Sequence, residues 1–230
     1  MIQPDARTQV TRRILVWDVP TRVFHWLLVL SFTVAFLTAE SERNRDIHVV
    51  SGYILLGLLA FRLLWGFIGT RYARFGSFLF GPGEVVAYLR SLIKRNPAHY
   101  AGHNPAGSVA IWLLLALGFA SAVSGVMVYQ EMGGDALEEL HEVSSYAMLA
   151  VVAVHILGVL VSSVMHRENL VRSMITGYKS DGQDEGINRS YAWLGVIMLV
   201  AVMAFWFGYP ASGQVSSGGE ASHAGQNDDD

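Results

Sequence analysis

The chain has 230 residues, of which 52% are hydrophobic and only 15% are charged, and its mean hydropathy is +0.37. These proportions are high for a soluble domain of this length, so they indicate a membrane protein. The formal net charge is only −3, and the chain has no cysteine. The lack of cysteine excludes disulfides, thiolate-ligated iron–sulfur clusters and haem attached covalently through a Cys-x-x-Cys-His motif.

Five apolar segments are long enough to cross about 30 Å of hydrocarbon as helices. They are predicted at residues 23–39, 47–69, 106–129, 143–165 and 191–209. A cleaved signal peptide is the alternative for the first segment, but Leu37 stands where such a cleavage site needs a small residue. The predicted fold class is therefore all-α, an integral membrane bundle of four helices with a fifth transmembrane helix at the carboxyl terminus.

Basic residues lie almost entirely on one side of the predicted bundle. They are found in the amino-terminal arm, the second connection and the fourth connection: Arg7, Arg12, Arg13, Arg22, Arg71, Arg74, Arg90, Lys94, Arg95, Arg167, Arg172, Lys179 and Arg189. The opposite side has only Arg43 and Arg45. Because short cytoplasmic loops retain Lys and Arg, the amino terminus is predicted to be cytoplasmic and the carboxyl terminus periplasmic.

Two histidines, His141 just before the fourth apolar segment and His155 within it, indicate a metal cofactor at two depths. His141 and His155 are fourteen residues apart, which is roughly 21 Å along a helix and nearly a whole number of turns. Both imidazoles therefore lie on one face of the helix. This arrangement suits two stacked haems.

Each of these histidines has a partner at a matching depth. His48 begins its helix near the same surface as His141, whereas His25 lies roughly 21 Å below that surface, at the level of His155. The pairing predicts an outer site at His48 and His141 and an inner site at His25 and His155. A lone membrane histidine is more often a structural hydrogen-bonding group, but two depth-matched pairs favour axial ligands.

Small residues and one arginine lie at the same depths. Gly52 and Gly125 leave room beside the outer pair for a porphyrin face, although close helix packing is the alternative for such small residues. Arg62 lies at the inner level, where an arginine costs about 2.5–3.5 kcal/mol at a helix centre. An anion such as a haem propionate can compensate its charge. Its side chain can also snorkel toward the cytoplasmic surface, and the two explanations are compatible.

At these positions the sequence resembles the bacterial cytochrome b561 and nickel–iron hydrogenase b-type cytochrome family. The matching residues are Trp17-Asp18, Arg22, His25-Trp26, His48, Gly52-Tyr53, Phe61-Arg62, Trp65-Gly66, Gly102-His103-Asn104-Pro105, Ser124-Gly125, His141 and His155. The resemblance implies two non-covalent b-type haems ligated by His25, His48, His141 and His155, and a location in the bacterial inner membrane. It also implies electron transfer between quinone and a protein partner.

The expected organisation follows from the spans and the resemblance. It consists of a cytoplasmic arm (1–22), a four-helix di-haem domain (23–178), a cytoplasmic connection (179–190), the fifth helix (191–209) and a disordered acidic tail (210–230). Residues 84–95 are expected to form an amphipathic helix at the cytoplasmic surface.

The remaining histidines are given structural roles. Asn104-Pro105 is typical of a helix N-cap and first turn, so His103 is expected to help start that helix, and His99 to lie in the same loop. His166 is expected at the membrane surface, because its depth does not match that of His25.

The predicted function is that of an electron-transfer subunit rather than a stand-alone enzyme, with no catalytic residues assigned. Its expected partners are the membrane, quinone and an extracytoplasmic c-type cytochrome, hydrogenase or other redox protein; a homodimer stays open, and no nucleic acid is expected. The alternative is a transporter or proton channel that uses the membrane His and Arg residues as a relay. Few helices and no clear inverted repeat argue against it.

Overall fold

The computed structural model describes residues 12–94, 98–181 and 185–220. Within them, five helices are long and apolar enough to span a membrane. These are α1 (Val19–Thr38), α2 (Arg45–Ile68), α4 (Pro105–Tyr129), α5 (Gly134–Met165) and α7 (Ala192–Glu220). The predicted all-α membrane bundle is confirmed.

Local sequence explains where several helices begin. The Asp18 carboxylate accepts a hydrogen bond from the Thr21 amide at 2.8 Å at the start of α1, and Asn104 Oδ1 accepts one from the Gly107 amide at 2.7 Å at the start of α4. A proline follows each cap, where its missing N–H costs nothing. The predicted cap at Asn104 is confirmed.

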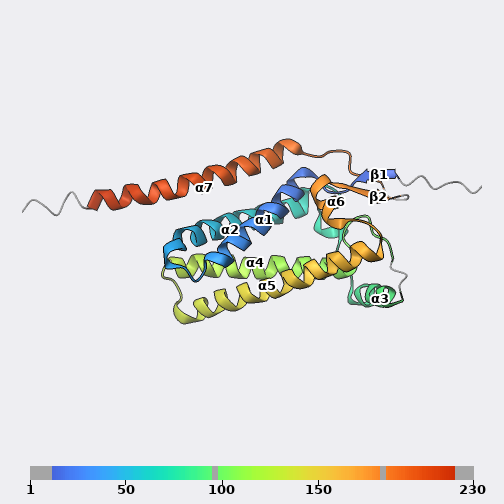
Figure 1. Ribbon diagram of the computed structural model, residues 1–230, viewed down its shortest axis with the longest axis horizontal. Coiled ribbons are helices and arrows are strands. Elements are labelled where there is room, and N and C mark those ends of the chain that lie inside the picture. The colour runs from blue at the N-terminus through green and yellow to red at the C-terminus, as the bar shows by residue number, and fades with distance from the viewer. Residues whose placement is uncertain (1–11, 95–97, 182–184, 221–230) are drawn as a thin grey trace, which may run out of the picture.

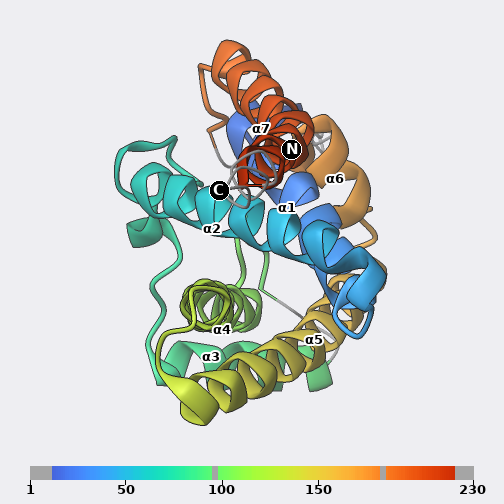
Figure 2. The ribbon, with the colours of Figure 1, turned by 90° about the vertical axis from the view of Figure 1, so that its left-hand side faces the viewer.

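The helices form layers around the long axis of the bundle. Helices α1 and α2 pack together on one side, α4 and α5 form an antiparallel hairpin on the other, and α7 lies on the outer side of α1 (Figure 1; Figure 2). Large apolar side chains such as Leu157, Val164 and Phe207 are exposed on the outer faces, as lipid contact requires.

The two ends of the bundle differ. At one end, which we call the ribbon end, strands β1 (Arg12–Leu15) and β2 (Tyr178–Asp181) pair antiparallel beside α6 (Leu170–Thr176), and α3 (Pro82–Ile93) lies at the same end (Figure 1). The α1–α2 and α4–α5 connections turn at the opposite end, which we call the hairpin end, and the first includes the short 3-10 helix η1 (Glu42–Asn44) (Figure 1). Another 3-10 helix, η2 (Phe75–Ser77), follows α2 at the ribbon end.

The β-ribbon is the main departure from the predicted organisation. Residues 12–15 are tied to residues 178–181, and α1 begins at Val19 instead of residue 23, so this part of the arm 1–22 belongs to the folded unit. Such pairing joins segments more than 160 residues apart, and local periodicity does not reveal it. Helix α3 lies across the bundle axis, as expected for a surface helix (Figure 2).

Helix α7 continues to Glu220, past the predicted end at residue 209. The structure thus differs from the predicted disordered tail over residues 210–220, and the rest of that tail lies outside the described residues. Extension of an existing helix needs no new nucleation, so a membrane helix can continue into a Gly- and Ser-containing segment.

Candidate functional site

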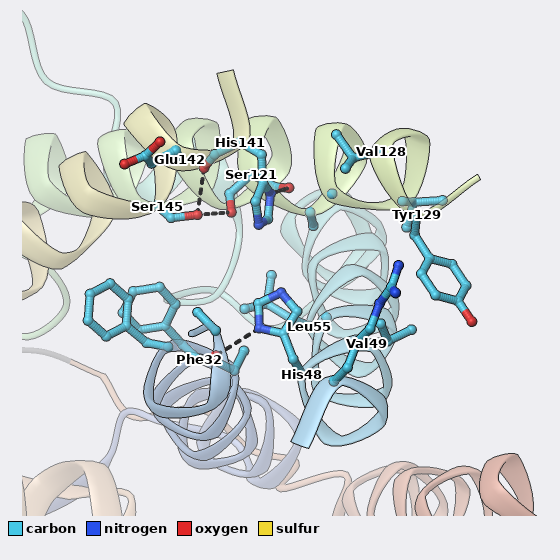
Figure 3. A pocket seen from close by; sticks show the side chains of 18 of the residues that line it. Phe32, His48, Val49, Leu55, Ser121, Val128, Tyr129, His141, Glu142 and Ser145 are labelled. Carbon is cyan, nitrogen blue, oxygen red and sulfur yellow. Dashed lines mark hydrogen bonds between the residues drawn. The ribbon is translucent and has the colours of Figure 1, made fainter. Parts of the chain in front are cut away.

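A cavity of about 460 Å³ opens at the hairpin end among α1, α2, α4 and α5. His48 from α2 and His141 from α5 point toward one another across it (Figure 3). Their ring centroids are 6.0 Å apart, and the two rings are nearly perpendicular at 86°. The predicted outer pair therefore lies together in one cavity.

Backbone carbonyls from neighbouring helices orient both rings. His48 Nδ1 lies 2.9 Å from the Ala35 carbonyl oxygen on α1, and His141 Nδ1 lies 2.8 Å from the Ser121 carbonyl oxygen on α4. With Nδ1–H donating to a carbonyl, a neutral imidazole has its lone pair on Nε2. Each ring is then in the tautomer that binds a metal through Nε2, with the orienting partner that metal-binding histidines usually have.

The separation of the two rings fits one metal ion between them. A metal–imidazole bond of about 2.0 Å on each side, with about 1.1 Å from each nitrogen to its ring centre, separates the centroids by about 6 Å. Among the described residues, no group of three or more His, Asp or Glu side chains is placed to hold a metal ion. Two imidazoles that face one another at this separation are the arrangement of a bis-histidine metal site.

The two predicted glycines have different surroundings. A Cβ on Gly125 would lie 2.7 Å from His141 Cε1, so this glycine leaves room for the imidazole itself. Gly52 lines the cavity, and a Cβ there would meet no protein atom within 4 Å. Gly118, one further small residue of α4, is packed against Leu59 and Met148.

Charged and phenolic groups surround the mouth of the outer cavity. Arg45 is the basic residue in its lining, together with the acidic residues Glu40, Glu42 and Glu142. The rings of Tyr53 and Tyr129, both in the lining, lie 6.4 Å apart. Sequence reasoning assigned no cofactor role to Arg45, although its place one turn before His48 is a usable signal.

The inner pair lies closer to the ribbon end. His25 on α1 and His155 on α5 interact electrostatically, and His155 lies about 21 Å along α5 from His141. His25 Nδ1 is buried without a hydrogen-bond partner. No backbone carbonyl therefore orients the His25 imidazole through Nδ1, whereas carbonyls orient the imidazoles of His48 and His141.

Arg62 is buried on α2, close enough to His103 to act on it electrostatically. Its side chain is only 4% exposed, and its guanidinium carbon lies 4.9 Å from the Phe75 ring centre and 5.7 Å from that of Phe78. These rings cover the side chain, so it does not reach solvent as the snorkelling alternative requires. Arg62 Nη1 is also buried without a hydrogen-bond partner.

Asp18 is a fully buried carboxylate in the same region, to which sequence reasoning gave no role. Besides capping α1, it accepts hydrogen bonds from Trp65 Nε1 at 3.0 Å and Thr70 Oγ1 at 2.6 Å. It acts electrostatically on Arg62, but its oxygens are already engaged by these three donors. The Trp17-Asp18 pair before Pro20 carries the sequence signal of an N-cap.

The other described histidines, His99, His103 and His166, lie at the ribbon end (Figure 1). His103 packs between Trp17 and Phe78, with centroid distances of 4.6 and 4.7 Å and ring planes tilted by 49° and 61°. Burial, followed by the positive charges of Arg62 and Lys179, lowers the pKa of His103 to about 3. His166 caps the end of α5 and lies 5.7 Å from His99, ring centre to ring centre, outside both predicted haem levels.

Comparison with known proteins places this arrangement in a family. The family model for prokaryotic cytochrome b561 matches residues 16–177. No solved structure matches significantly.

Several curated relatives share one description. A probable Ni/Fe-hydrogenase B-type cytochrome subunit of Rhodobacter capsulatus is 24% identical over 74% of this chain and 83% of that protein. One of Rhizobium leguminosarum bv. viciae is 26% identical, over 71% of this chain and 87% of that protein. A probable Ni/Fe-hydrogenase 1 B-type cytochrome subunit of Escherichia coli (strain K12) is 23% identical over 72% of this chain and 90% of that protein. With a family match over more than two thirds of its length, this chain, whose described residues include five candidate membrane spans, belongs to the prokaryotic cytochrome b561 family of membrane b-type cytochromes.

Proposed function

We propose that this protein is a di-haem electron-transfer subunit that passes electrons between quinone in the membrane and an extracytoplasmic redox protein. His48 and His141 would hold an outer b-type haem, and His25 and His155 an inner one. The geometry of the outer pair is the observation that carries the proposal, because both tautomers and the ring separation suit one haem iron.

A haem held by two histidines would supply a one-electron couple, and such ligation favours electron transfer over oxygen chemistry. The polypeptide provides the orientation and the spacing of the ligands. Carbonyls of Ala35 and Ser121 orient the outer imidazoles, and α5 sets the distance between the two levels.

The lack of an anion bonded directly to Arg62 supports an inner haem. A buried cation costs several kcal/mol even after relaxation, whereas contacts with aromatic rings recover up to about 2 kcal/mol. Arg62 has the rings of Phe75 and Phe78 beside it but no carboxylate bonded to Nη1. A haem propionate would supply the missing anion.

The relatives support a hydrogenase as the protein partner, since their descriptions name them hydrogenase cytochrome subunits. The distribution of basic residues supports a cytoplasmic ribbon end and a periplasmic hairpin end. Because the native chain has no cysteine, single cysteines placed at Glu139 and Lys94 can test this orientation. A membrane-impermeant maleimide should label the first in spheroplasts and the second only after lysis; the reverse pattern would overturn the orientation.

The haem content tests the function. A pyridine haemochrome assay on the purified protein should give two non-covalent haems per chain, and His141→Ala should reduce the value toward one by removing the outer haem. His155→Ala should remove the inner haem instead, and His99→Ala serves as the control that retains both. A colourless wild-type protein would refute the proposal and favour the transporter alternative.

A further inference from the structure

Four buried side-chain atoms in the described part of the chain have no hydrogen-bond partner. They are Thr21 Oγ1, His25 Nδ1, Arg62 Nη1 and His103 Nδ1. Thr21 lies one turn from His25 on α1, and His103 interacts electrostatically with both Arg62 and His25. The four atoms thus belong to one region at the ribbon side of the inner histidines.

Such a concentration of unmade hydrogen bonds indicates a ligand. Each buried unsatisfied group costs about 1–3 kcal/mol, and native chains keep few of them. Arg62 can only donate hydrogen bonds and is charged, so the ligand must offer anionic oxygen. Asp18 does not supply it directly: among the described residues its carboxylate accepts from Thr21, Trp65 and Thr70 and makes no hydrogen bond or ion pair with Arg62.

Several contacts fix the position of His103 in the loop before α4, which includes residues 100–104. Lys179 Nζ donates to the carbonyl oxygens of Tyr100 and Ala101, each at 3.0 Å, and so anchors the loop to β2. Gly102 lets the loop approach Tyr72, since a Cβ there would lie 2.9 Å from the Tyr72 ring. The rings of Trp17 and Phe78 then enclose the imidazole.

We propose that His103, together with Arg62 and Thr21, forms a carboxylate-binding site for a propionate of the inner haem. Arg62 provides the opposite charge, while a neutral His103 donates from Nδ1 and Thr21 from its hydroxyl. His103 is thus a cofactor-positioning residue as well as part of the start of α4. The inference rests on the inner haem of the proposed function.

This site predicts how the inner haem responds to loss of His103. Without that hydrogen bond the propionate keeps more of its negative charge near the iron, which disfavours reduction. His103→Leu should therefore lower the midpoint potential of the inner haem by the equivalent of about a tenfold change in the oxidised-to-reduced ratio, 59 mV for one electron. His103→Gln, which can still donate, should recover part of the shift.

The experiment uses the holoprotein, with the outer haem as an internal reference. Both haems are titrated in the wild type, in His103→Leu and His103→Gln, and in His99→Gln, a matched change four residues away in the same loop. Redox-difference infrared spectra with haem labelled by ¹³C at the propionate carboxyls provide a second readout. The labelled carboxylate band should shift in His103→Leu and stay in place in His99→Gln.

The possible failures are distinct. A wild-type protein with one haem, unaffected by His25→Ala or His155→Ala, would refute the inner haem itself. If two haems are present but His103→Leu leaves the inner potential and the labelled band unchanged, the propionate site alone is refuted. Shifts in His103→Leu and Arg62→Gln that are less than additive in the double variant would support a shared ligand, and full additivity would overturn it.

Discussion

His48 and His141 illustrate how single backbone contacts define a ligand geometry. Each Nδ1 meets a carbonyl of another helix, so the tautomer and the ring plane are fixed by the polypeptide. His25 has no such contact at Nδ1. The outer pair is therefore preorganised by the protein alone, whereas polar atoms at the inner level remain without partners.

Gly125 should be sensitive to a single methyl group. In Gly125→Ala the new Cβ would lie within 3 Å of the His141 ring, and the ring would have to leave the Ser121 carbonyl. Overpacking of this kind costs about 1–3 kcal/mol, so haem binding at the outer site should weaken by roughly 5- to 150-fold. The measurement is haem content after dilution, with Gly158→Ala, which meets no atom within 4 Å, as the control. Equal retention in both variants would contradict the assigned role.

Acidification should destabilise the ribbon end through His103. Its folded-state pKa of about 3 lies below the ordinary 6.5, so the unfolded chain binds the proton more readily between these values. The contribution of neutral His103 to the free energy of unfolding is fully present above pH 6.5. It decreases as the pH falls from 6.5 toward 3, and the loss reaches about 2 kcal/mol at pH 5. In the haem-free protein, where no propionate lies beside His103 to raise its pKa, the thermal midpoint should fall between pH 7 and pH 5, and His103→Gln should reduce that fall. An identical pH dependence in the variant would remove His103 from the explanation.

At the scale of elements, sequence pattern predicts the spans well and the connections poorly. A bilayer demands long apolar helices, so all five spans could be found by length and composition. A constant helix rise also allows histidines to be compared by depth. The β-ribbon and the setting of His103 depend instead on contacts between distant segments, such as Lys179 with the Tyr100 carbonyl, and no local signal specifies them.

The fifth span should be dispensable for haem binding. The family match ends at residue 177, and α7 packs on the outer side of α1 and α2, where Met198 contacts an apolar cluster that includes Phe24 and Leu58. Lipid can cover that apolar face at little cost, because it is as apolar as a helix. A chain ending at Ser190 should therefore retain two haems with unchanged potentials.

A second truncation makes this test specific. A chain ending at Gly177 also loses β2 and Lys179, which anchors the loop before α4. It should perturb the inner haem and spare the outer one. Loss of both haems in the chain ending at Ser190 would show that α7 supports the bundle itself.

On the scale of the whole molecule, the two ends have opposite character. The ribbon end combines basic connections with a buried polar cluster, whereas the hairpin end exposes many acids. The exposed acidic residues there are Glu40, Glu42, Asp46, Glu131, Asp135, Glu138, Glu139 and Glu142, against Arg43 and Arg45. The outer cavity opens among some of these groups, so its surroundings favour a basic partner.

Electron exchange with a basic extracytoplasmic partner should accordingly depend on salt. Raising the ionic strength from 0.01 to 0.15 M shortens the Debye length from about 30 to about 8 Å, which screens steering between exposed charges. The second-order rate of haem oxidation or reduction by the partner should fall over this range. Replacing Glu138, Glu139 and Glu142 by Gln should reduce both the rate at low salt and its salt dependence, while Glu185→Gln at the ribbon end should change neither. Charged residues outside the contact act mainly on association, so a rate that is independent of salt would mean that the acidic end reflects membrane topology and does not guide docking.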